Sequence, residues 1–134
     1  MDFTRTGEYF MSDFELNDLI RFLYGLSMLE YRLFEEIMIL NNPTSKYLME
    51  RLNRRNIGMV NKSLRHLSEI GLVVRNKVSI EDRTGFHYTY TTKPLGEIKT
   101  QIKEKIEKWY TETSEKIDKL EDYYNSKFET VPLE

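Results

Sequence analysis

The chain has 134 residues, of which 31% are charged and 40% hydrophobic, and it contains no cysteine. This length suits one compact domain with appended helices, and the composition is too apolar for an intrinsically disordered protein.

No uncharged run exceeds nine residues. A spanning helix needs about 20 apolar residues, so the composition excludes a membrane protein. Without cysteine there is no disulfide, thiolate chemistry or cysteine-ligated zinc. The start, Met1-Asp2-Phe3, does not resemble a signal peptide, and a cytoplasmic location is expected.

The net charge of −2 conceals a strong segregation of charge along the chain. Residues 1–40 carry a balance of −5, residues 41–93 of +6 and residues 94–134 of −3. A cationic middle between acidic flanks lets a protein bind a polyanion while its isoelectric point stays acidic. We therefore expect the middle segment to bind nucleic acid. The alternative is a mixed surface of solvated charges.

Two closely spaced helices are the first predicted elements, after an aromatic-rich arm at residues 1–11. Ser12-Asp13-Phe14-Glu15 has the spacing of a capping box, and Gly25 suits the end of the helix that it starts. A second box, Ser27-Met28-Leu29-Glu30, starts another helix, which Asn41-Asn42-Pro43 ends. The apolar stripes of the two helices are Leu16, Leu19, Ile20, Leu23 and Tyr24, then Leu29, Leu33, Phe34, Ile37 and Leu40.

A third and a fourth helix follow, separated by a short polar turn at residues 53–56. Thr44 or Ser45 caps the third helix, residues 44–53, which is expected to turn Tyr47, Leu48 and Leu52 inward. Asn56 caps the fourth helix, residues 57–70, and Gly71 closes it. Its predicted buried stripe is Ile57, Val60, Leu64 and Leu67.

The period of the pattern changes from 3.6 to 2 after Gly71. In residues 72–80 the even positions are mostly apolar, and in residues 86–91 aromatic side chains alternate with polar ones. Residues 81–85 between these runs are typical of a turn. The segment 72–92 therefore predicts a β-hairpin.

From Pro94 the pattern predicts one long helix. Its apolar stripe repeats every eleven residues, or 3.67 residues per turn, which favours nearly straight helix pairing. The 34 positions span roughly 50 Å, more than the preceding domain can cover, so the stripe calls for a partner helix, most simply from a second copy. The alternative is a helix folded back on its own domain. The stripe comprises Leu95, Ile98, Ile102, Ile106, Trp109, Thr113, Ile117, Leu120, Tyr124 and Phe128.

The order of these elements predicts the fold class: mainly α with a small β-hairpin wing (α+β), that is, a winged helix-turn-helix. We expect three regions: residues 1–25, an arm and helix for dimerisation; residues 26–93, the winged helix-turn-helix; and residues 94–134, a long C-terminal dimerisation helix with a short tail. The helix at 57–70 is then the recognition helix, whose outward side chains lie in the major groove of DNA. The dimerisation residues are predicted to be Leu16, Leu19, Ile20, Leu23, Leu95, Ile98, Ile102, Ile106, Trp109, Ile117, Leu120 and Tyr124.

The recognition helix carries side chains that suit DNA. Asn61 and Arg65 are four residues apart, so they share one face, and these residue types pair with adenine and guanine edges. Gly58 lets the backbone approach a phosphate, and Met59 suits a thymine methyl. His66 and Glu69 also lie off the buried stripe. The full predicted DNA-contacting set, with Arg83 at the wing tip, is Lys46, Arg54, Arg55, Asn56, Gly58, Met59, Asn61, Lys62, Arg65, Arg75, Lys77 and Arg83.

Two motifs resemble a known family. The start Gly25-Leu26-Ser27-Met28-Leu29-Glu30 and the ending Leu64, Leu67, Gly71-Leu72-Val73 resemble the TrmB-like and MarR-like winged-helix regulators of archaea. The aromatic strand at residues 85–90 and Trp109-Tyr110 resemble short members that end in a helix. The resemblance covers roughly residues 12–125 and implies a dimeric transcription regulator. Full-length TrmB proteins carry a sugar-binding domain for which this chain has no room, so no sugar effector is carried over.

The sequence therefore predicts a homodimeric, sequence-specific regulator that binds double-stranded DNA at a palindromic operator. Its wing would touch the minor groove or the backbone, and repression by occlusion is favoured over activation. The alternatives are a winged-helix protein-interaction module and a non-specific architectural DNA-binding protein. An enzyme is not expected, because no nucleophile–base pair is identifiable. His66 and His87 lack metal-ligand spacing, so no metal and no cofactor are expected, and a small-molecule effector is left open.

Overall fold

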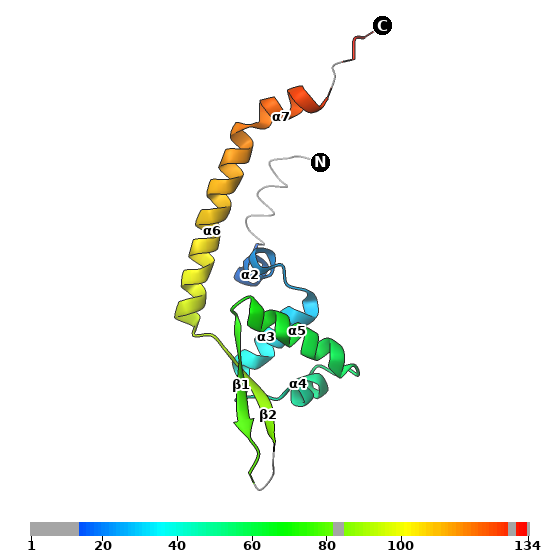
Figure 1. The fold of residues 1–134 in the computed structure, drawn as a ribbon, viewed down its shortest axis with the longest axis vertical. Helices are drawn as coiled ribbons and strands as arrows, with labels where there is room; N and C mark the ends of the chain where they lie inside the picture. Colours follow the sequence, from blue (N-terminus) through cyan, green and yellow to red (C-terminus); the bar gives the residue numbers. More distant parts are fainter. Residues whose placement is uncertain (1–13, 82–84, 129–130, 134) are drawn as a thin grey trace. The chain divides into compact units, whose positions relative to one another are not determined.

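The computed structural model describes residues 14–81, 85–128 and 131–133 of the chain. Those residues form six α-helices and one two-stranded sheet, in the order α2, α3, α4, α5, β1, β2, α6, α7 (Figure 1). The chain divides into two compact units, Met1–Lys99 and Thr100–Glu134, which are described in turn. No helix in the described ranges is long and apolar enough to cross a membrane.

α2, Leu16–Tyr24, begins later than the capping-box pattern predicts. Its N-cap is Glu15 rather than Ser12, and the Glu15 N–H donates to Asp18 Oδ2 at 3.0 Å. Asp18, three residues after Glu15, therefore takes the place that the sequence pattern assigned to Glu15 as the acidic residue of a capping box. Ser12 lies outside the described residues, but residues 14 and 15 are not helical, so the predicted start was wrong. Gly25 ends α2 as predicted, with φ 63°.

α3, Met28–Ile39, follows the predicted pattern closely. The Glu30 N–H donates to Ser27 Oγ at 3.1 Å, and the Ser27 N–H donates to Glu30 Oε1 at 2.8 Å, which completes the capping box. The helix buries Leu33, Phe34 and Ile37, while Leu29 and Leu40 at the ends of the stripe are half-buried.

α4, Ser45–Arg51, is capped by Thr44, whose Oγ1 accepts the Tyr47 N–H at 3.2 Å. Leu48 is fully buried, but Tyr47 is 48% exposed, so its predicted inward position was wrong. Adjacent helical residues point about 100° apart, and a helix this short presents one narrow stripe to the core. Leu48 lies on that stripe and packs into the core, whereas Tyr47 points away from the core.

α5, Ile57–Glu69, begins after a tight turn in which Asn53 adopts φ 55°, a left-handed conformation that asparagine tolerates. Asn56 Oδ1 accepts the Met59 N–H at 3.2 Å and caps the helix as predicted. Val60, Leu64 and Leu67 are buried. Ile57 is 40% exposed, contrary to prediction, because it occupies the first position of the helix as the chain leaves the turn.

The hairpin consists of β1, Val73–Ser79, and β2, Phe86–Thr92, paired antiparallel. Arg75 lies opposite Tyr90 and Lys77 opposite Tyr88, so these four side chains share one face. The predicted turn at residues 81–85 includes residues 82–84, which lie outside the described residues. The Tyr90 N–H donates to the carbonyl of Pro43 at 3.0 Å, which attaches β2 to the segment before α4.

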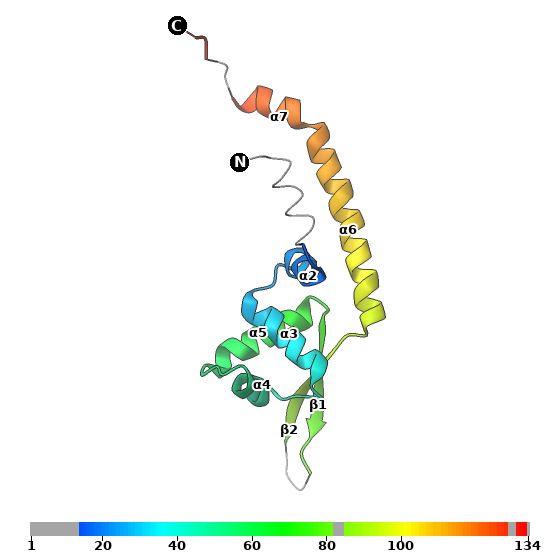
Figure 2. The ribbon, with the colours of Figure 1, turned by 180° about the vertical axis from the view of Figure 1, so that it is seen from behind.

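The core of the first unit lies where α3, α4 and α5 gather around the base of the hairpin (Figures 1 and 2). Ten apolar residues there are exposed by 3% or less: Leu33, Phe34, Ile37, Leu48, Val60, Leu64, Leu67, Leu72, Val73 and Ile98. They come from α3, α4, α5, the start of β1 with the turn before it, and the start of α6, so packing fixes α5 against the base of the hairpin. The unit has the predicted winged helix-turn-helix fold, mainly helical with a small β-hairpin.

The second unit contains most of α6, Leu95–Asp118, and all of α7, Leu120–Lys127. The prediction of one continuous helix was wrong, because the backbone breaks at Lys119, with φ −97° and ψ 9°. The Lys119 N–H donates to the carbonyl of Lys116 at 3.1 Å, one residue nearer than an α-helix requires. There is no glycine or proline between Glu97 and Val131, and nothing in the sequence explains the break.

Candidate nucleic-acid interface

The outer face of α5 carries the side chains predicted to read DNA bases. Asn61, Lys62 and Arg65 are exposed, because the opposite face of the helix is held in the core. Asn61 and Arg65 are one turn apart on the same side, as their spacing requires. An exposed helix face with one amide and one guanidinium can donate and accept hydrogen bonds at base edges.

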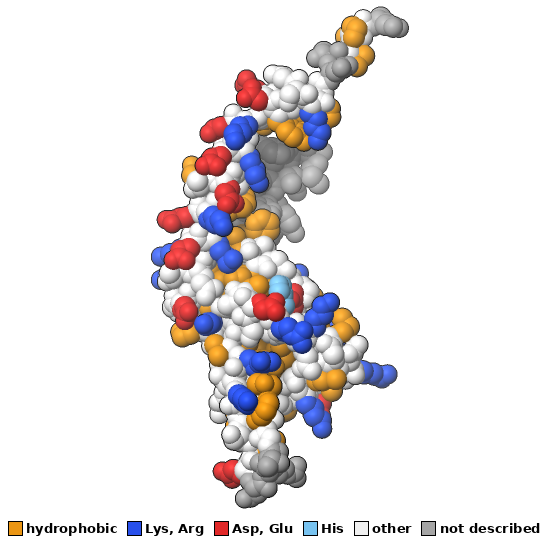
Figure 3. Space-filling view, in the orientation of Figure 1, with side chains coloured by type: hydrophobic (Ala, Val, Ile, Leu, Met, Phe, Trp, Pro, Cys, Tyr) orange, Lys and Arg blue, Asp and Glu red, His pale blue; other side chains and the backbone are white. Residues whose placement is uncertain are grey.

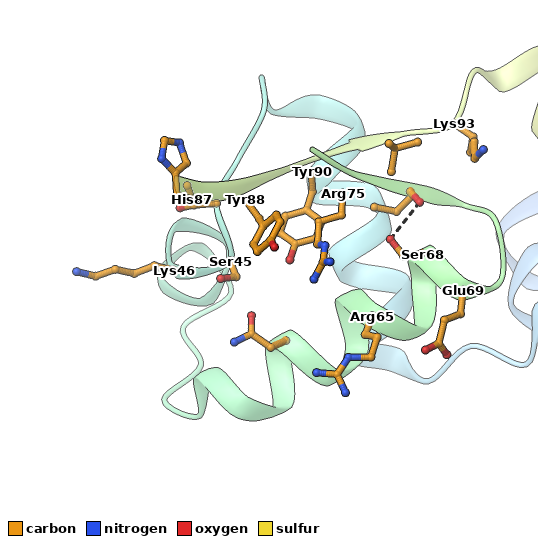
Figure 4. A pocket seen from close by; sticks show the side chains of 14 residues that line it. Ser45, Lys46, Arg65, Ser68, Glu69, Arg75, His87, Tyr88, Tyr90 and Lys93 are labelled. Carbon is orange, nitrogen blue, oxygen red and sulfur yellow. Dashed lines mark hydrogen bonds between the residues drawn. The ribbon is translucent and has the colours of Figure 1, made fainter. Parts of the chain in front are cut away.

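A groove of about 970 Å³ lies between α5, the start of α4 and the hairpin. Figure 4 shows Tyr88 and Tyr90 on β2 and Arg75 on β1 projecting towards α5, where Arg65 stands. Four of the predicted DNA-contacting residues line the groove: Lys46, Asn61, Arg65 and Arg75. Residues with side chains that the sequence did not single out for DNA complete the lining: Thr44, Ser45, Ser68, Glu69, Val73, Val74, His87, Tyr88, Tyr90 and Lys93.

The groove is predominantly cationic. Its lining includes four cationic residues, Lys46, Arg65, Arg75 and Lys93, and one acidic residue, Glu69. Burial raises the pKa of the Tyr90 phenol, and the nearby Arg75 and Arg65 oppose that rise. On the face drawn in Figure 3, Lys and Arg side chains stand over the hairpin and α5, whereas along α6 basic and acidic side chains are interspersed.

One face of the hairpin is a ladder of alternating cations and aromatic rings, here called the cation–aromatic ladder: Arg75, Lys77, Phe86, Tyr88 and Tyr90. The Arg75 guanidinium carbon lies 4.0 Å from the centroid of the Tyr88 ring, and Lys77 Nζ lies 3.8 Å from that of Phe86. The rings of Phe86 and Tyr88 meet edge to face at 5.3 Å. Tyr90 is buried at the base, and Phe86 is 47% exposed towards the tip.

The predicted residues at the start of α5 lie apart from the groove. Arg54, Arg55, Asn56 and Met59 surround a small hollow of about 180 Å³ together with Leu29 and Val60. The side-chain oxygen of Asn56 is used in capping the helix. Asn56 therefore has a structural role in capping α5, although the residue is exposed.

Gly58 has a steric role that the sequence did not indicate. A Cβ atom at this position would come within 3.1 Å of Asn56 Oδ1, the oxygen that caps α5. The missing side chain thus leaves room for the cap. Lys62 is exposed on α5 and Lys77 on the ladder, but neither lines the groove. Arg83 lies outside the described residues.

His66 does not join the outward face of α5. Its Nδ1 is paired with Glu30 Oε2 on α3, and Glu30 is 8% exposed. Sequence spacing placed His66 off the buried stripe, but its partner is 36 residues away and could not be inferred.

The tyrosines of the groove were missed, although one signal was present. Tyr88 and Tyr90 alternate with polar residues, just as Arg75 and Lys77 alternate on the preceding strand. The pairing register, which places both alternations on one face, depends on the length of the turn. Without that register, the sequence could not show whether the rings and the cations meet.

The predicted dimerisation residues fall into two groups. On α2, Leu16 is exposed, and Leu19, Ile20 and Leu23 are half-buried. Along α6 and α7, Ile98 is buried within the single chain and Ile102 is half-buried. The remaining members are exposed by 39–62%: Leu95, Ile106, Trp109, Ile117, Leu120 and Tyr124. In the second unit, Ile117, Leu120, Tyr123 and Tyr124 help to line an apolar hollow of about 430 Å³.

Within the described ranges, no group of three or more histidine, aspartate and glutamate side chains is arranged to hold a metal ion. Two acid–base pairs in this part of the chain join α3 to α4 and α5. One is Arg51–Glu36, with Nε 2.5 Å from Oε2, and the other is His66–Glu30. These pairs connect helices rather than forming a separate site.

No model of a known protein family matches the chain. Two archaeal relatives do match: the uncharacterized proteins MJ1082 and MJ1503 of Methanocaldococcus jannaschii. MJ1082 is 31% identical over 100 residues, which cover 75% of this chain and 81% of that protein. MJ1503 is 30% identical over 107 residues, which cover 78% of each. The chain belongs to the family of MJ1082 and MJ1503. Both relatives are uncharacterized, so membership in the MJ1082 family assigns no activity.

Two solved structures have the fold of this MJ1082-family member. A possible transcriptional regulator from Methanosarcina mazei Go1 matches with a TM-score of 0.67 and 15% identity, covering 76% of this chain and 85% of that one. The ST1889 protein of the thermoacidophilic archaeon Sulfolobus tokodaii matches with a TM-score of 0.60 and 23% identity, covering 72% and 92%. At these identities the likeness establishes the fold and not the function.

Proposed function

We propose that the chain is a DNA-binding transcription regulator of the MarR-like or TrmB-like kind, with no catalytic activity of its own. α5 lies in the major groove, and the hairpin acts as a wing on the minor groove or the backbone. The observation that carries the proposal is the groove of four cations, Lys46, Arg65, Arg75 and Lys93, beside the exposed face of α5. A polyanion fits that arrangement.

Charge and position favour DNA over a protein partner. The +6 balance of residues 41–93 is concentrated in the winged-helix unit, between acidic flanks. A protein-interaction module has no need to gather cations around one groove, whereas phosphate contacts dominate the affinity of DNA-binding proteins. The fold shared with the possible regulator from Methanosarcina mazei Go1 is consistent with this role.

The proposal includes a homodimer. Apolar side chains are exposed along much of α6 and α7, and a second copy is the simplest cover for them. The two copies of α5 would then contact two DNA half-sites about 34 Å apart, which predicts a palindromic operator. A small dimer on such a site represses by blocking access to the promoter.

The deciding experiment is a fluorescence-anisotropy titration of the chain against the duplex upstream of its own gene and a scrambled duplex, at several salt concentrations. A preference of at least roughly 10³ for the upstream duplex, with salt-sensitive affinity, supports a sequence-specific regulator. Equal affinities call for footprinting: a bounded site supports regulation, and protection that spreads with concentration indicates an architectural protein. No binding at low salt refutes the DNA proposal.

Arg65→Ala tests the role of α5 in the same assay. Loss of a guanidinium that pairs with a guanine edge is expected to cost about 1–3 kcal/mol and to relax preference at one base position. Lys103→Ala is the matched control, because Lys103 is an exposed cation on α6. Equal weakening on every sequence would make Arg65 a phosphate contact instead.

A further inference from the structure

The cation–aromatic ladder suggests how the wing meets DNA, an inference that rests on the proposed function. Lysine and arginine side chains are normally flexible, and a ligand that immobilises them incurs an entropic cost. Here two cationic heads already lie over rings, Arg75 over Tyr88 at 4.0 Å and Lys77 over Phe86 at 3.8 Å. Both distances are within the range of a cation–π interaction. The heads are thus partly ordered before any ligand arrives.

The spacing of the two cations suits consecutive phosphates of one DNA strand. Arg75 and Lys77 are two residues apart on β1 and share a face, so their Cα atoms are separated by about 7 Å. Neighbouring phosphates of one strand of B-DNA, with a rise of 3.4 Å and about ten base pairs per turn, also lie about 7 Å apart. An extended β-strand can therefore run along the DNA backbone so that each of its two cations contacts one phosphate.

The ladder is also continuous with the groove beside α5. Arg75, Tyr88 and Tyr90 line that groove together with Asn61 and Arg65 of α5 (Figure 4). A duplex whose major groove receives α5 therefore presents its flanking backbone to this face of the hairpin. Glu69 is the acidic group in the groove lining, and it lies on α5 rather than on the ladder.

We propose that the cation–aromatic ladder is a phosphate-backbone contact, in which Arg75 and Lys77 bind adjacent phosphates and Tyr88 and Phe86 act as positioning residues. The wing then contributes affinity and register without reading base sequence. Arg75 and Lys77 already lie over these rings, which leaves less ring surface on which unpaired bases could stack.

The test measures the salt dependence of binding to the upstream and scrambled duplexes for Arg75→Ala, Lys77→Ala and the double variant. Removing one cation that binds a phosphate is expected to lower the magnitude of the slope of log K against log salt by about 0.9, and the double variant by about twice that. Affinity should fall on both duplexes by the same factor. Lys103→Ala, on α6, is the control for removal of an exposed cation.

The positioning role is tested with Tyr88→Leu and Tyr88→Phe. Loss of the ring is expected to weaken binding to both duplexes about two- to fivefold, with a smaller change of slope than in Arg75→Ala, because the charge remains. The phenylalanine variant keeps the ring and should bind more tightly than the leucine variant. Phe86→Leu repeats the test at a more exposed position. It still tests the positioning role if a thermal melt shows that Tyr88→Leu does not fold.

Three results would overturn the inference. If the cation variants change the preference between duplexes while the slope stays the same, the ladder reads bases. If the unaltered chain binds duplex DNA and all ladder variants bind as it does, the ladder is not part of the interface, and the regulator proposal survives. If the unaltered chain binds neither duplex, the proposed function and the ladder proposal fail together.

Discussion

A single carboxylate, that of Glu30, connects α3 to the helix proposed to read DNA. It accepts the N–H of Ser27 at 2.8 Å and pairs with His66 of α5. Burial tends to raise the pKa of this carboxyl, but the hydrogen bonds from Ser27 and His66 and the charge of His66 outweigh burial and hold the pKa below its usual 4.5. The ionised form is therefore the one that the fold stabilises.

This lowered pKa predicts how stability depends on pH. A carboxyl with a lower pKa in the folded state contributes stability above its unfolded value of 4.5, and that stability is lost as the pH falls through the folded pKa. Glu30→Gln is expected to cost about 1–3 kcal/mol near neutral pH and to reduce the loss of stability below 4.5. Urea unfolding from pH 3 to 7 measures both effects.

Glu50→Gln on α4 is the matched control, because it makes the same change at an exposed glutamate. It should leave the acid sensitivity of the fold intact. If Glu30→Gln and Glu50→Gln have the same pH profile, the Glu30 contacts do not govern acid stability.

Residues that act locally were the most predictable. Ser27, Asn56 and Thr44, one of the two candidates for its helix, cap helices as predicted, because a cap involves a side chain and a backbone N–H only three residues away. The same rule failed at α2, where Glu15 and not Ser12 is the N-cap. The Glu30–His66 pair joins residues 36 positions apart. No local pattern encodes such a pair, so it required the fold.

At the scale of elements, the cap of α5 links stability to the candidate interface. Asn56→Ala removes the acceptor of the Met59 N–H and is expected to lower the free energy of unfolding by about 1 kcal/mol. Fraying of the first turn should also weaken DNA binding, since Asn61 follows that turn closely. Chemical denaturation and anisotropy provide the two measurements.

Asn56→Asp separates the cap from a direct DNA contact. Aspartate retains the oxygen that caps the helix but brings a negative charge towards phosphate. It should keep the stability and lose affinity if Asn56 also lies near DNA. If Asn56→Ala leaves the stability unchanged, the cap has no energetic importance.

Periodicity predicted which elements form but not where each one stops. The hydrophobic pattern located the helices of the winged-helix unit and the hairpin, because burial on one side imposes a period. It placed Tyr47 and Ile57 inward although both are exposed, since a stripe drawn through the sequence does not show where a helix leaves the core. It also ran through the break at Lys119, where the apolar spacing is unchanged.

At the scale of the whole molecule, charge and apolar surface are divided between the two units. Basic side chains gather around the groove of the first unit. Along the second unit, basic and acidic side chains are interspersed (Figure 3), and the apolar side chains of the predicted stripe are largely exposed. The candidate DNA surface and the candidate dimerisation surface can therefore be altered separately.

The dimer proposal predicts that one charge placed in the stripe of α6 will separate the copies. Ile117 is 61% exposed in the single chain and borders the apolar hollow near the end of α6. Burying a carboxylate without a partner in a helix–helix interface is costly, so Ile117→Glu should yield a monomer. Sedimentation equilibrium measures the mass, and a thermal melt checks that the winged-helix unit remains folded.

Thr111→Glu is the matched control, because Thr111 is exposed and lies on the opposite side of α6 from the stripe. It should remain dimeric. The Ile117→Glu monomer should lose most of its affinity for a palindromic operator but keep the weaker binding of one half-site, since the groove and α5 are unaltered. An unaltered chain that sediments as a monomer at the concentrations where it binds DNA would contradict the dimer, and each winged-helix unit would then act alone.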